Sequence, residues 1–320
     1  MKLSQAANEA LASVVVFLVA LPLCMGIAIA SGLPPAAGLL SGIVGGLVVG
    51  AIAGSPLQVS GPAAGLVVLV VDIIQTHGLA QFGVIVLVAG GLQVLAGRFR
   101  LGRWFRAVAP EVLQAMLAGI GVLIVSSQLH VMIDDAPAAS GISNMLALPS
   151  AFAKAWSPAL GAAHRMAAGI GVLTLTLMLV WNLVRDRLPK ALGILPAPLI
   201  AVAGATATAT LLDLPILRVS VPESLSAMVQ LPSMTAFSSL AQTTVLGSAL
   251  ALAFVASAQA LLSASAVDEL HDGPRSDLDR ELTAQGLGNM VVGLLGGLPL
   301  TGVIVRSSAN VAAGAKTRWS

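Results

Sequence analysis

Charged side chains and cysteine are both scarce in this chain of 320 residues. Asp, Glu, Lys and Arg together make up 9% of it, whereas a soluble globular domain carries about 25%. This scarcity excludes a soluble enzyme, a disordered chain and a nucleic-acid binder built on a basic surface. The single cysteine, Cys24, excludes an intrachain disulfide and a metal cluster of cysteine ligands, and we expect no metal and no cofactor.

Long apolar runs take up most of the chain instead. Hydrophobic residues make up 57% of it, and runs such as 83–97 are unbroken, unlike the alternating strands of a membrane β-barrel. The pattern predicts an all-α polytopic protein in a lipid bilayer. A full span takes roughly 20 residues, so the third, ninth and tenth candidate segments are too short to cross alone. The ten segments lie near 11–32, 35–53, 62–76, 80–97, 109–130, 166–184, 191–213, 239–265, 283–297 and 302–314.

The basic residues predict how these segments are oriented. They gather between the fourth and fifth segments, between the sixth and seventh, and at both ends of the chain: Lys2, Arg98, Arg100, Arg103, Arg106, Arg185, Arg187, Lys190, Lys316 and Arg318. A cytoplasmic N-terminus places all of them inside, as the positive-inside rule requires. Loops 131–165 and 214–238 then lie outside. We therefore expect a multi-pass protein of the inner (plasma) membrane with its N-terminus in the cytoplasm.

Two of the short segments open with residues that start helices. The third follows Gly54 and opens with the stretch Ser60 to Gly65, where Ser suits the N-cap and Pro the first turn. The tenth follows the stretch Gly296 to Leu300, and Thr301 with Gly302 can cap a helix there. Paired short segments interrupted by Gly and Pro indicate a midplane site in an inverted-repeat transporter, and their free N–H groups suit an anion. The alternative is that the small residues only allow tight helix contacts.

Two of the polar residues within the apolar spans are candidates for a functional site. Arg306 is near the middle of the tenth segment, and an intramembrane charge is a functional hypothesis by default. Its alternative is a structural ion pair or a side chain that reaches the interface. Gln259 lies in mid-span of the eighth segment, where it either faces a site or bonds a neighbouring helix.

These motifs resemble those of the SulP family of anion transporters, whose animal members form the SLC26 group. The stretch Leu21 to Ala28 is similar to the family's first-helix motif, and Gly32 to Leu39 is similar to its Gly-Leu-Pro-Pro-x-x-Gly-Leu signature. Gly54 to Gly65 resembles the motif before the third helix. The stretch from Glu281 to Arg318 keeps the order and spacing of the family's ninth and tenth helices, and it is the most specific part of the match.

The resemblance implies a transporter of two inverted seven-helix repeats (7+7) that works by elevator-type alternating access, forms a homodimer and is not an enzyme. The implied core covers about 1–98 and 239–320, and a partial gate covers about 104–213. Family members typically carry a cytoplasmic STAS domain after the fourteenth helix. This sequence stops at Ser320, just after the tenth, so we expect a fragment or a truncated product without helices 11–14 and without a STAS domain.

The resemblance also implies a small inorganic anion, such as sulfate or bicarbonate, bound between the N-termini of the third and tenth helices. The backbone N–H groups of Ala63, Ala64, Val303 and Ile304 are then candidate donors. Gln259 stands where many members carry an acid that supports coupling to a proton or sodium. The implied site residues are Ser60, Gly61, Pro62, Ala63, Ala64, Gln259, Gly302, Val303, Ile304 and Arg306, with Leu23 and Cys24 also lining the site.

Two other functions remain open at this point. A nucleobase or uracil-type permease shares the inverted fold, but it usually carries an acid in the eighth or tenth helix to bond the base. A non-transporting remnant, or a regulatory partner of a full-length carrier, would fit a chain of ten segments. An intramembrane enzyme is disfavoured because no His-Glu-x-x-His motif occurs.

Overall fold

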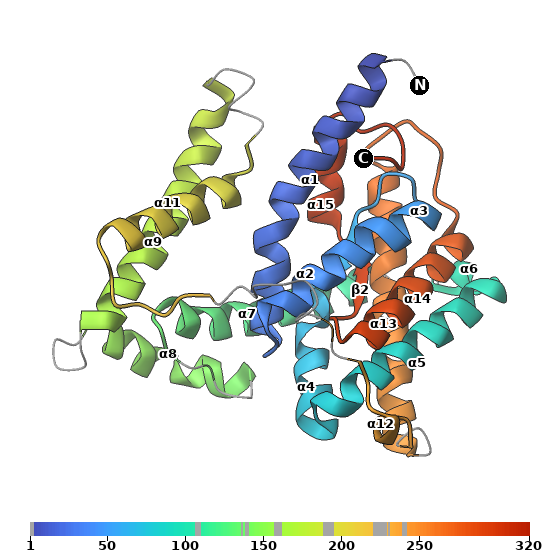
Figure 1. Ribbon diagram of the computed structural model, residues 1–320, viewed down its shortest axis with the longest axis horizontal. Coiled ribbons are helices and arrows are strands. Elements are labelled where there is room, and N and C mark those ends of the chain that lie inside the picture. Colours follow the sequence, from blue (N-terminus) through green and yellow to red (C-terminus); the bar gives the residue numbers. More distant parts are fainter. Residues whose placement is uncertain are drawn as a thin grey trace. The chain divides into compact units, whose positions relative to one another are not determined.

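The computed structural model describes residues 3–105, 110–135, 137, 141–156, 162–187, 195–219, 229, 231–238 and 242–320. This part of the chain is almost entirely helical (Figure 1). The helices are α1 (Leu3–Ala30), α2 (Pro35–Val44), α3 (Gly50–Ile52), α4 (Val67–His77), α5 (Leu79–Arg98), α6 (Gly102–Phe105), α7 (Pro110–Met132), α8 (Gly141–Trp156), α9 (Ala162–Val184), α11 (Ala197–Leu211), α12 (Met234–Ser238), α13 (Thr243–Asp268), α14 (Leu278–Leu295) and α15 (Ile304–Ala312). The strands are β1 (Ser60–Pro62) and β2 (Leu300–Gly302). A π-helical turn, η1 (Gly45–Val49), joins α2 to α3, and a 3-10 turn, η2 (Ala64–Leu66), leads into α4.

Five described stretches are long and apolar enough to cross a membrane. They are Glu9–Ala30, Pro35–Ile52, Leu79–Arg98, Ala162–Val184 and Thr243–Asp268. Each of the ten predicted segments overlaps a helix, which confirms the predicted all-α polytopic fold. The first residues of the fifth, seventh and eighth predicted segments, 109, 191–194 and 239–241, lie outside the described residues.

The predicted outer loops contain helices that the sequence did not predict. Within 131–165 the structure has α8, a helix of 16 residues with Pro149 inside it. Its exposed side chains include Ile142, Leu146 and Trp156, so it presents an apolar face. The loop prediction was wrong because Pro149 and the nearby polar residues suggest a break, whereas the apolar residues recur at helical spacing. Similarly, the short helix α12 lies within 214–238.

The orientation and the division into a moving core and a fixed gate stay predictions. Lys2, Arg106 and Lys190, three of the residues that set the orientation, lie outside the described residues. By backbone contacts the chain forms two compact units, one of residues 1–117 with 221–320 and one of residues 118–220. Each unit is described here by itself.

In the first unit, α5 and α14 pack together more extensively than any other described pair of helices. Glycines recur every seven residues along the α5 side of this contact, at Gly83, Gly90 and Gly97. A Cβ at Gly90 would lie 2.6 Å from the Gly286 carbonyl oxygen of α14. The helices therefore approach so closely that only glycine fits, as small residues allow in membrane helix pairs.

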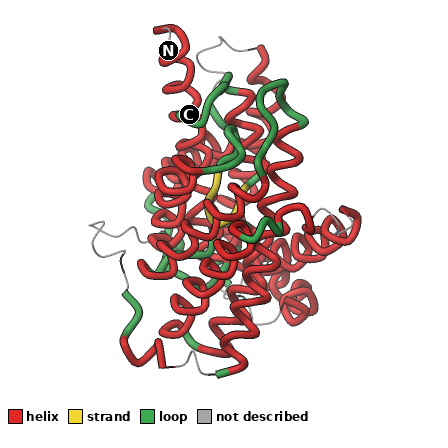
Figure 2. Tube along the Cα trace, turned by 90° about the vertical axis from the view of Figure 1, so that its right-hand side faces the viewer, coloured by secondary structure: helices red, strands yellow, loops and turns green. Residues whose placement is uncertain are grey.

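The two strands lie among the helices of this unit (Figure 2). They pair antiparallel with the register Ser60 to Gly302, Gly61 to Thr301 and Pro62 to Leu300. All six strand residues are buried. The unit's main apolar core, which includes Leu66, Ile85 and Leu252, extends to Leu300 of β2. An extended segment in an apolar interior must pair its backbone groups, and the two strands pair with each other.

The second unit is formed by the latter part of α7 together with α8, α9 and α11. In it, His130 of α7 is 3% exposed. Its Nδ1 lies 3.1 Å from an Asp135 carboxylate oxygen, and its Nε2 lies 3.2 Å from the Asn144 carbonyl oxygen of α8. The Lys154 ammonium of α8 donates to both Asp135 oxygens, at 2.9 and 3.0 Å. This network joins the end of α7 to both ends of α8.

Candidate functional site

Each strand leads directly into a helix too short to span a bilayer. β1 continues through Ala63 into η2 and α4, and β2 continues through Val303 into α15. Because the strands are antiparallel, α4 and α15 leave the pair in opposite directions (Figure 1). We call η2–α4 and α15 the half-helices. Their positions confirm the two predicted half-length segments.

The predicted caps of the half-helices are wrong. Ser60 and Pro62, expected at a helix start, lie in β1, and the N-cap is Ala63 without a side-chain hydrogen bond. Thr301 likewise lies in β2, and the N-cap of α15 is Val303. The polar side chains bond neighbouring helices instead. The Thr301 hydroxyl donates to the Ala256 carbonyl of α13 at 3.1 Å, and the Ser60 hydroxyl accepts a bond from α14.

Three of the four predicted backbone donors have no partner in the described part of the chain. No described residue accepts a hydrogen bond from the N–H groups of Ala63, Ala64 or Ile304. The fourth prediction is wrong, since the Val303 N–H donates to the Val59 carbonyl at 3.0 Å. The strand pairing extends by one residue there and uses this N–H. Each half-helix thus keeps free N–H groups at its positive dipole end.

Arg306 is the buried cation of the site. It is 1% exposed, and its Nη2 donates to the Pro62 carbonyl at 3.2 Å. Its Nε and Nη1 have no partner, and no carboxylate among the described residues forms an ion pair with it. The Nη1 atom packs so closely on Gly61 that a Cβ at Gly61 would collide with it. The Cys24 side chain, 2% exposed, lies near the guanidinium.

The other predicted residues have different environments. Gln259 of α13 is 8% exposed and its Oε1 has no partner among the described residues. Leu23, next to Cys24 in α1, is half-buried. Gly302 has no room for a side chain, because the Gln58 amide occupies the place of a Cβ. Gln58 itself donates to the Ala260 carbonyl at 3.2 Å, and it is a residue near the site that the sequence did not single out.

The sequence analysis did not include a row of buried polar side chains on α14 among the site residues. Glu281 is fully buried, and one carboxylate oxygen accepts from the N–H groups of Gly54 and Ser55, at 2.9 and 3.0 Å. The Gln285 amide donates to the other Glu281 oxygen and to the Ser60 hydroxyl, both at 2.7 Å. One face of α14 therefore bonds β1 and the residues that precede it.

Asn289 continues this row towards β2. It accepts from the Leu300 N–H at 2.8 Å and donates to the Leu300 carbonyl at 3.0 Å. It also donates to the Gln93 side chain of α5 at 2.7 Å. Glu281, Gln285 and Asn289 are four residues apart, and this spacing was the signal in the sequence that could have placed them on one helix face.

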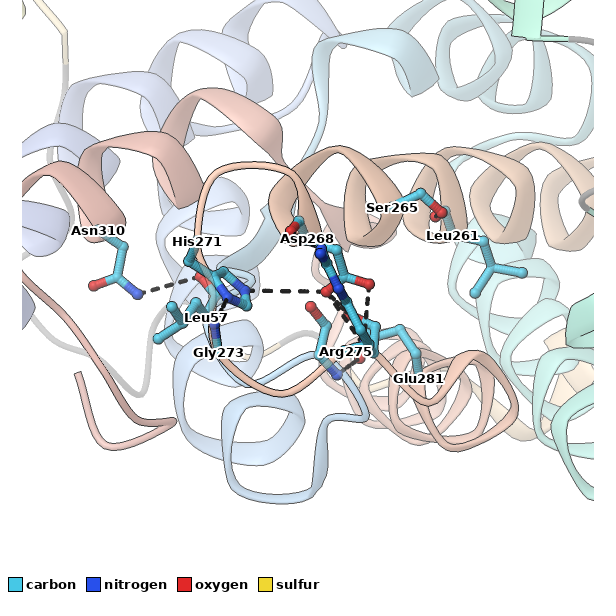
Figure 3. A network of polar contacts seen from close by, with 11 residues as sticks. Leu57, Leu261, Ser265, Asp268, His271, Gly273, Arg275, Glu281 and Asn310 are labelled. Atoms are coloured by element: carbon cyan, nitrogen blue, oxygen red, sulfur yellow. Dashed lines mark hydrogen bonds and ion pairs between the residues drawn. The ribbon is translucent and has the colours of Figure 1, made fainter.

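A second polar network closes the turn between α13 and α14 (Figure 3). The Asp268 carboxylate accepts from the Ser276 hydroxyl at 2.7 Å and from its N–H at 3.0 Å. The Gly273 N–H donates to His271 Nδ1 at 2.9 Å. Figure 3 also shows Asn310 of α15, whose amide donates to the Leu57 carbonyl at 3.3 Å. The bonds of Asp268 and His271 lie within the turn between the two helices, and the bond of Asn310 ties α15 to the segment before β1.

Half-helices that begin at an antiparallel strand pair inside a helical membrane protein define a class of transporter fold. The chain belongs to the sulfate permease family, whose sequence profile matches residues 7–320. It is 30% identical to YvdB of Bacillus subtilis (strain 168) over 316 residues, which are 96% of this chain and 56% of that protein. It is 25% identical to the bicarbonate transporter BicA of Picosynechococcus over 322 residues, covering 94% of this chain and 53% of BicA. These matches confirm the family that the motifs resemble.

Solved structures show the same fold. The transmembrane domain of a cyanobacterial BicA matches with a TM-score of 0.82 at 22% identity, over 100% of this chain and 80% of that one. Murine Slc26a9, an anion transporter in the inward-facing state, matches with a TM-score of 0.77 at 16% identity, over 99% of this chain and 55% of that one. The chain spans about half the length of the curated relatives it matches.

Proposed function

We propose that this chain binds a small inorganic anion, with sulfate and bicarbonate as the leading candidates, and carries it across the inner membrane. The observation that carries the proposal is Arg306, a cation that is 1% exposed, with two nitrogens unpartnered and no carboxylate beside it in the described part of the chain. A charge buried without a counter-charge is costly, so a bound anion is the natural partner.

The half-helices supply the remaining recognition. Among the described residues, the N–H groups of Ala63, Ala64 and Ile304 have no acceptor, and the dipoles of both half-helices favour negative charge at these ends. Backbone N–H groups and a guanidinium can donate hydrogen bonds to the oxygens of any small oxyanion, so sulfate and bicarbonate are both suitable ligands. One side of the proposed site is formed by backbone, from Ser60, Gly61, Pro62, Gly302 and Val303. Three side chains line the site: Leu23, Cys24 and Gln259.

Transport in this proposal is elevator-type alternating access. The core carries both half-helices and moves against the gate, the N-terminus is cytoplasmic, and the working form is a homodimer. Gln259 cannot ionise, so any coupling to a proton would have to use another residue. Family membership and the cationic site favour an anion over a nucleobase, whose recognition would call for an acid in α13 or α15.

The test is anion binding by the purified chain with Arg306→Gln, which removes the charge and keeps a polar side chain. Thermal unfolding is followed while sodium sulfate or sodium bicarbonate is added, because a ligand of the folded state raises the unfolding temperature. Losing a buried charge partner costs about 2–5 kcal/mol, so anion affinity should fall by about thirtyfold or more. Arg98→Gln, the same change at the exposed end of α5, should bind like the wild type. Wild-type affinity in a folded Arg306→Gln variant would refute the proposal.

A further inference from the structure

One face of α14 holds the strands from which both half-helices begin. Through Glu281 it bonds the segment before β1, through Gln285 it bonds β1 itself, and through Asn289 it bonds β2. All three side chains are at most 2% exposed, and their bonds to these segments are 2.7 to 3.0 Å long. A single rigid helix thus sets the positions of both strands.

Asn289 fixes β2 most tightly. Its amide bonds both the N–H and the carbonyl of Leu300, which is the residue that pairs with Pro62 of β1. Bonding both groups of one residue fixes the rotation of the strand as well as its distance from α14. The amide is held in turn by Gln93, which donates to the Ser257 hydroxyl of α13 at 3.2 Å.

Pro62 is also the residue whose carbonyl accepts from Arg306. A shift of either strand would therefore move the guanidinium and the free N–H groups relative to each other. Binding one small ion needs its donors held to within a fraction of an ångström, and second-layer hydrogen bonds are what hold them.

We propose that Glu281, Gln285 and Asn289 are positioning residues for the anion site. They do not touch the anion. They lock β1 and β2 to α14, so that the N-terminal turns of both half-helices and Arg306 keep one arrangement. The inference rests on the proposed function for its consequence, a higher anion affinity, but the locking of the strands is testable without any anion.

The first experiment uses Cys24, the only cysteine of the chain, as a reporter beside Arg306. Asn289→Leu removes all three bonds of the amide at similar volume. Loss of buried hydrogen bonds makes local opening easier, so N-ethylmaleimide should modify Cys24 at least about tenfold faster than in the wild type. The control is Thr283→Val on the same helix, which removes only a bond within α14 and should leave the rate unchanged.

The second measurement is the sulfate affinity of the same variants, taken from the rise of unfolding temperature with sulfate concentration. Asn289→Leu should weaken sulfate at least about tenfold, and Thr283→Val should not. Gln285→Met, which keeps the length and loses the bonds to Ser60 and Glu281, serves if Asn289→Leu does not fold. In Gln285→Met, too, Cys24 should be modified faster and sulfate should bind more weakly.

The outcomes separate this inference from the proposed function. The positioning role is overturned if the folded Asn289→Leu or Gln285→Met variant is less stable without anion but matches Thr283→Val in two respects. These are the rate at which N-ethylmaleimide modifies Cys24 and the affinity for sulfate. If the wild type responds to neither sulfate nor bicarbonate, the proposed function fails, and the Cys24 rates still decide whether α14 locks the strands.

Discussion

At the scale of single residues, the surroundings of Arg306 explain why glycine stands at Gly61. The guanidinium lies against the Gly61 backbone and donates to the next residue, Pro62. Gly45 is restricted in another way, because a Cβ there would meet the Ser60 carbonyl, which belongs to the backbone of β1. A side-chain tip can move away from a new methyl group, but a paired strand cannot do so cheaply.

This contrast gives a prediction for Gly61→Ala. The methyl group should displace the guanidinium and weaken anion affinity at least about tenfold, which is 1.4 kcal/mol, while the anion-free unfolding temperature changes little. Gly46→Ala is the matched control, since a Cβ at Gly46 has nothing within 4 Å. The account is contradicted if Gly61→Ala binds sulfate and bicarbonate as the control does.

A second residue-scale prediction concerns Asp135, outside the membrane spans. Burial raises the pKa of this carboxyl, but the bonds from Lys154 and His130 lower it more, so the pKa falls below its ordinary value of 3.8. A depressed carboxyl pKa adds stability above the unfolded-state value, and that stability is lost as the pH falls through the folded-state value. Asp135→Asn should thus lower the unfolding temperature at pH 7.

The difference between Asp135→Asn and the wild type should shrink as the pH falls below about 4, because the carboxyl of the unfolded chain takes up its proton there and the carboxyl of the folded protein does so only at a lower pH. Thermal unfolding of both proteins from pH 7 to pH 3 measures this. A difference that stays constant over the whole range would show that the ion pair with Lys154 contributes nothing.

At the scale of elements, the half-helices illustrate what the sequence predicts well. Gly and Pro before each short apolar segment were enough to predict that a helix begins near Ala63 and near Val303, because both residues disfavour a helix and here directly precede an apolar run. The caps were predicted wrongly because the β1–β2 pairing joins residues about 240 positions apart. No local pattern reports such a partner.

The polar row on α14 and the helix α8 also show that local sequence does not report distant contacts. The spacing of Glu281, Gln285 and Asn289 was readable, but which strands they bond was not, since that depends on the packing of α14 against both halves of the unit. In α8, Pro149 favours a loop locally, and the apolar face of the helix outweighs it. Arg306 and the free N–H groups could be predicted, because a charge inside an apolar run and the start of a helix are both visible in the local sequence.

The contact of α5 with α14 gives the element-scale prediction. Gly90→Ala would place a methyl group 2.6 Å from backbone atoms of Gly286 and Met290, so the helices must separate. Overpacking of this kind costs about 1–3 kcal/mol, and the unfolding temperature should fall. At Gly91 nothing lies within 4 Å, and Gly91→Ala should leave stability unchanged or raise it. Equal unfolding temperatures for the two variants would contradict the close packing.

At the scale of the whole molecule, the family and the fold are established, and the transport cycle is proposed. The first unit holds both half-helices, Arg306 and the α14 row. Whether this chain transports alone, or works as part of a longer protein or beside a full-length carrier, is decided by anion uptake into vesicles that contain the purified chain. Uptake that Arg306→Gln abolishes would establish a carrier. Absence of uptake with intact anion binding would show that the chain needs either the rest of a longer protein or a full-length carrier.

The most direct test of the central claim is an anomalous diffraction measurement on crystals soaked in bromide, an anion whose position anomalous scattering reports without ambiguity. The account predicts a bromide peak within hydrogen-bonding reach of the Arg306 guanidinium, close to the free N–H groups that begin the half-helices. It also predicts that the peak is absent from Arg306→Gln crystals. Bromide found only on the protein surface, with the guanidinium still unpartnered, would contradict the claim that Arg306 binds the anion.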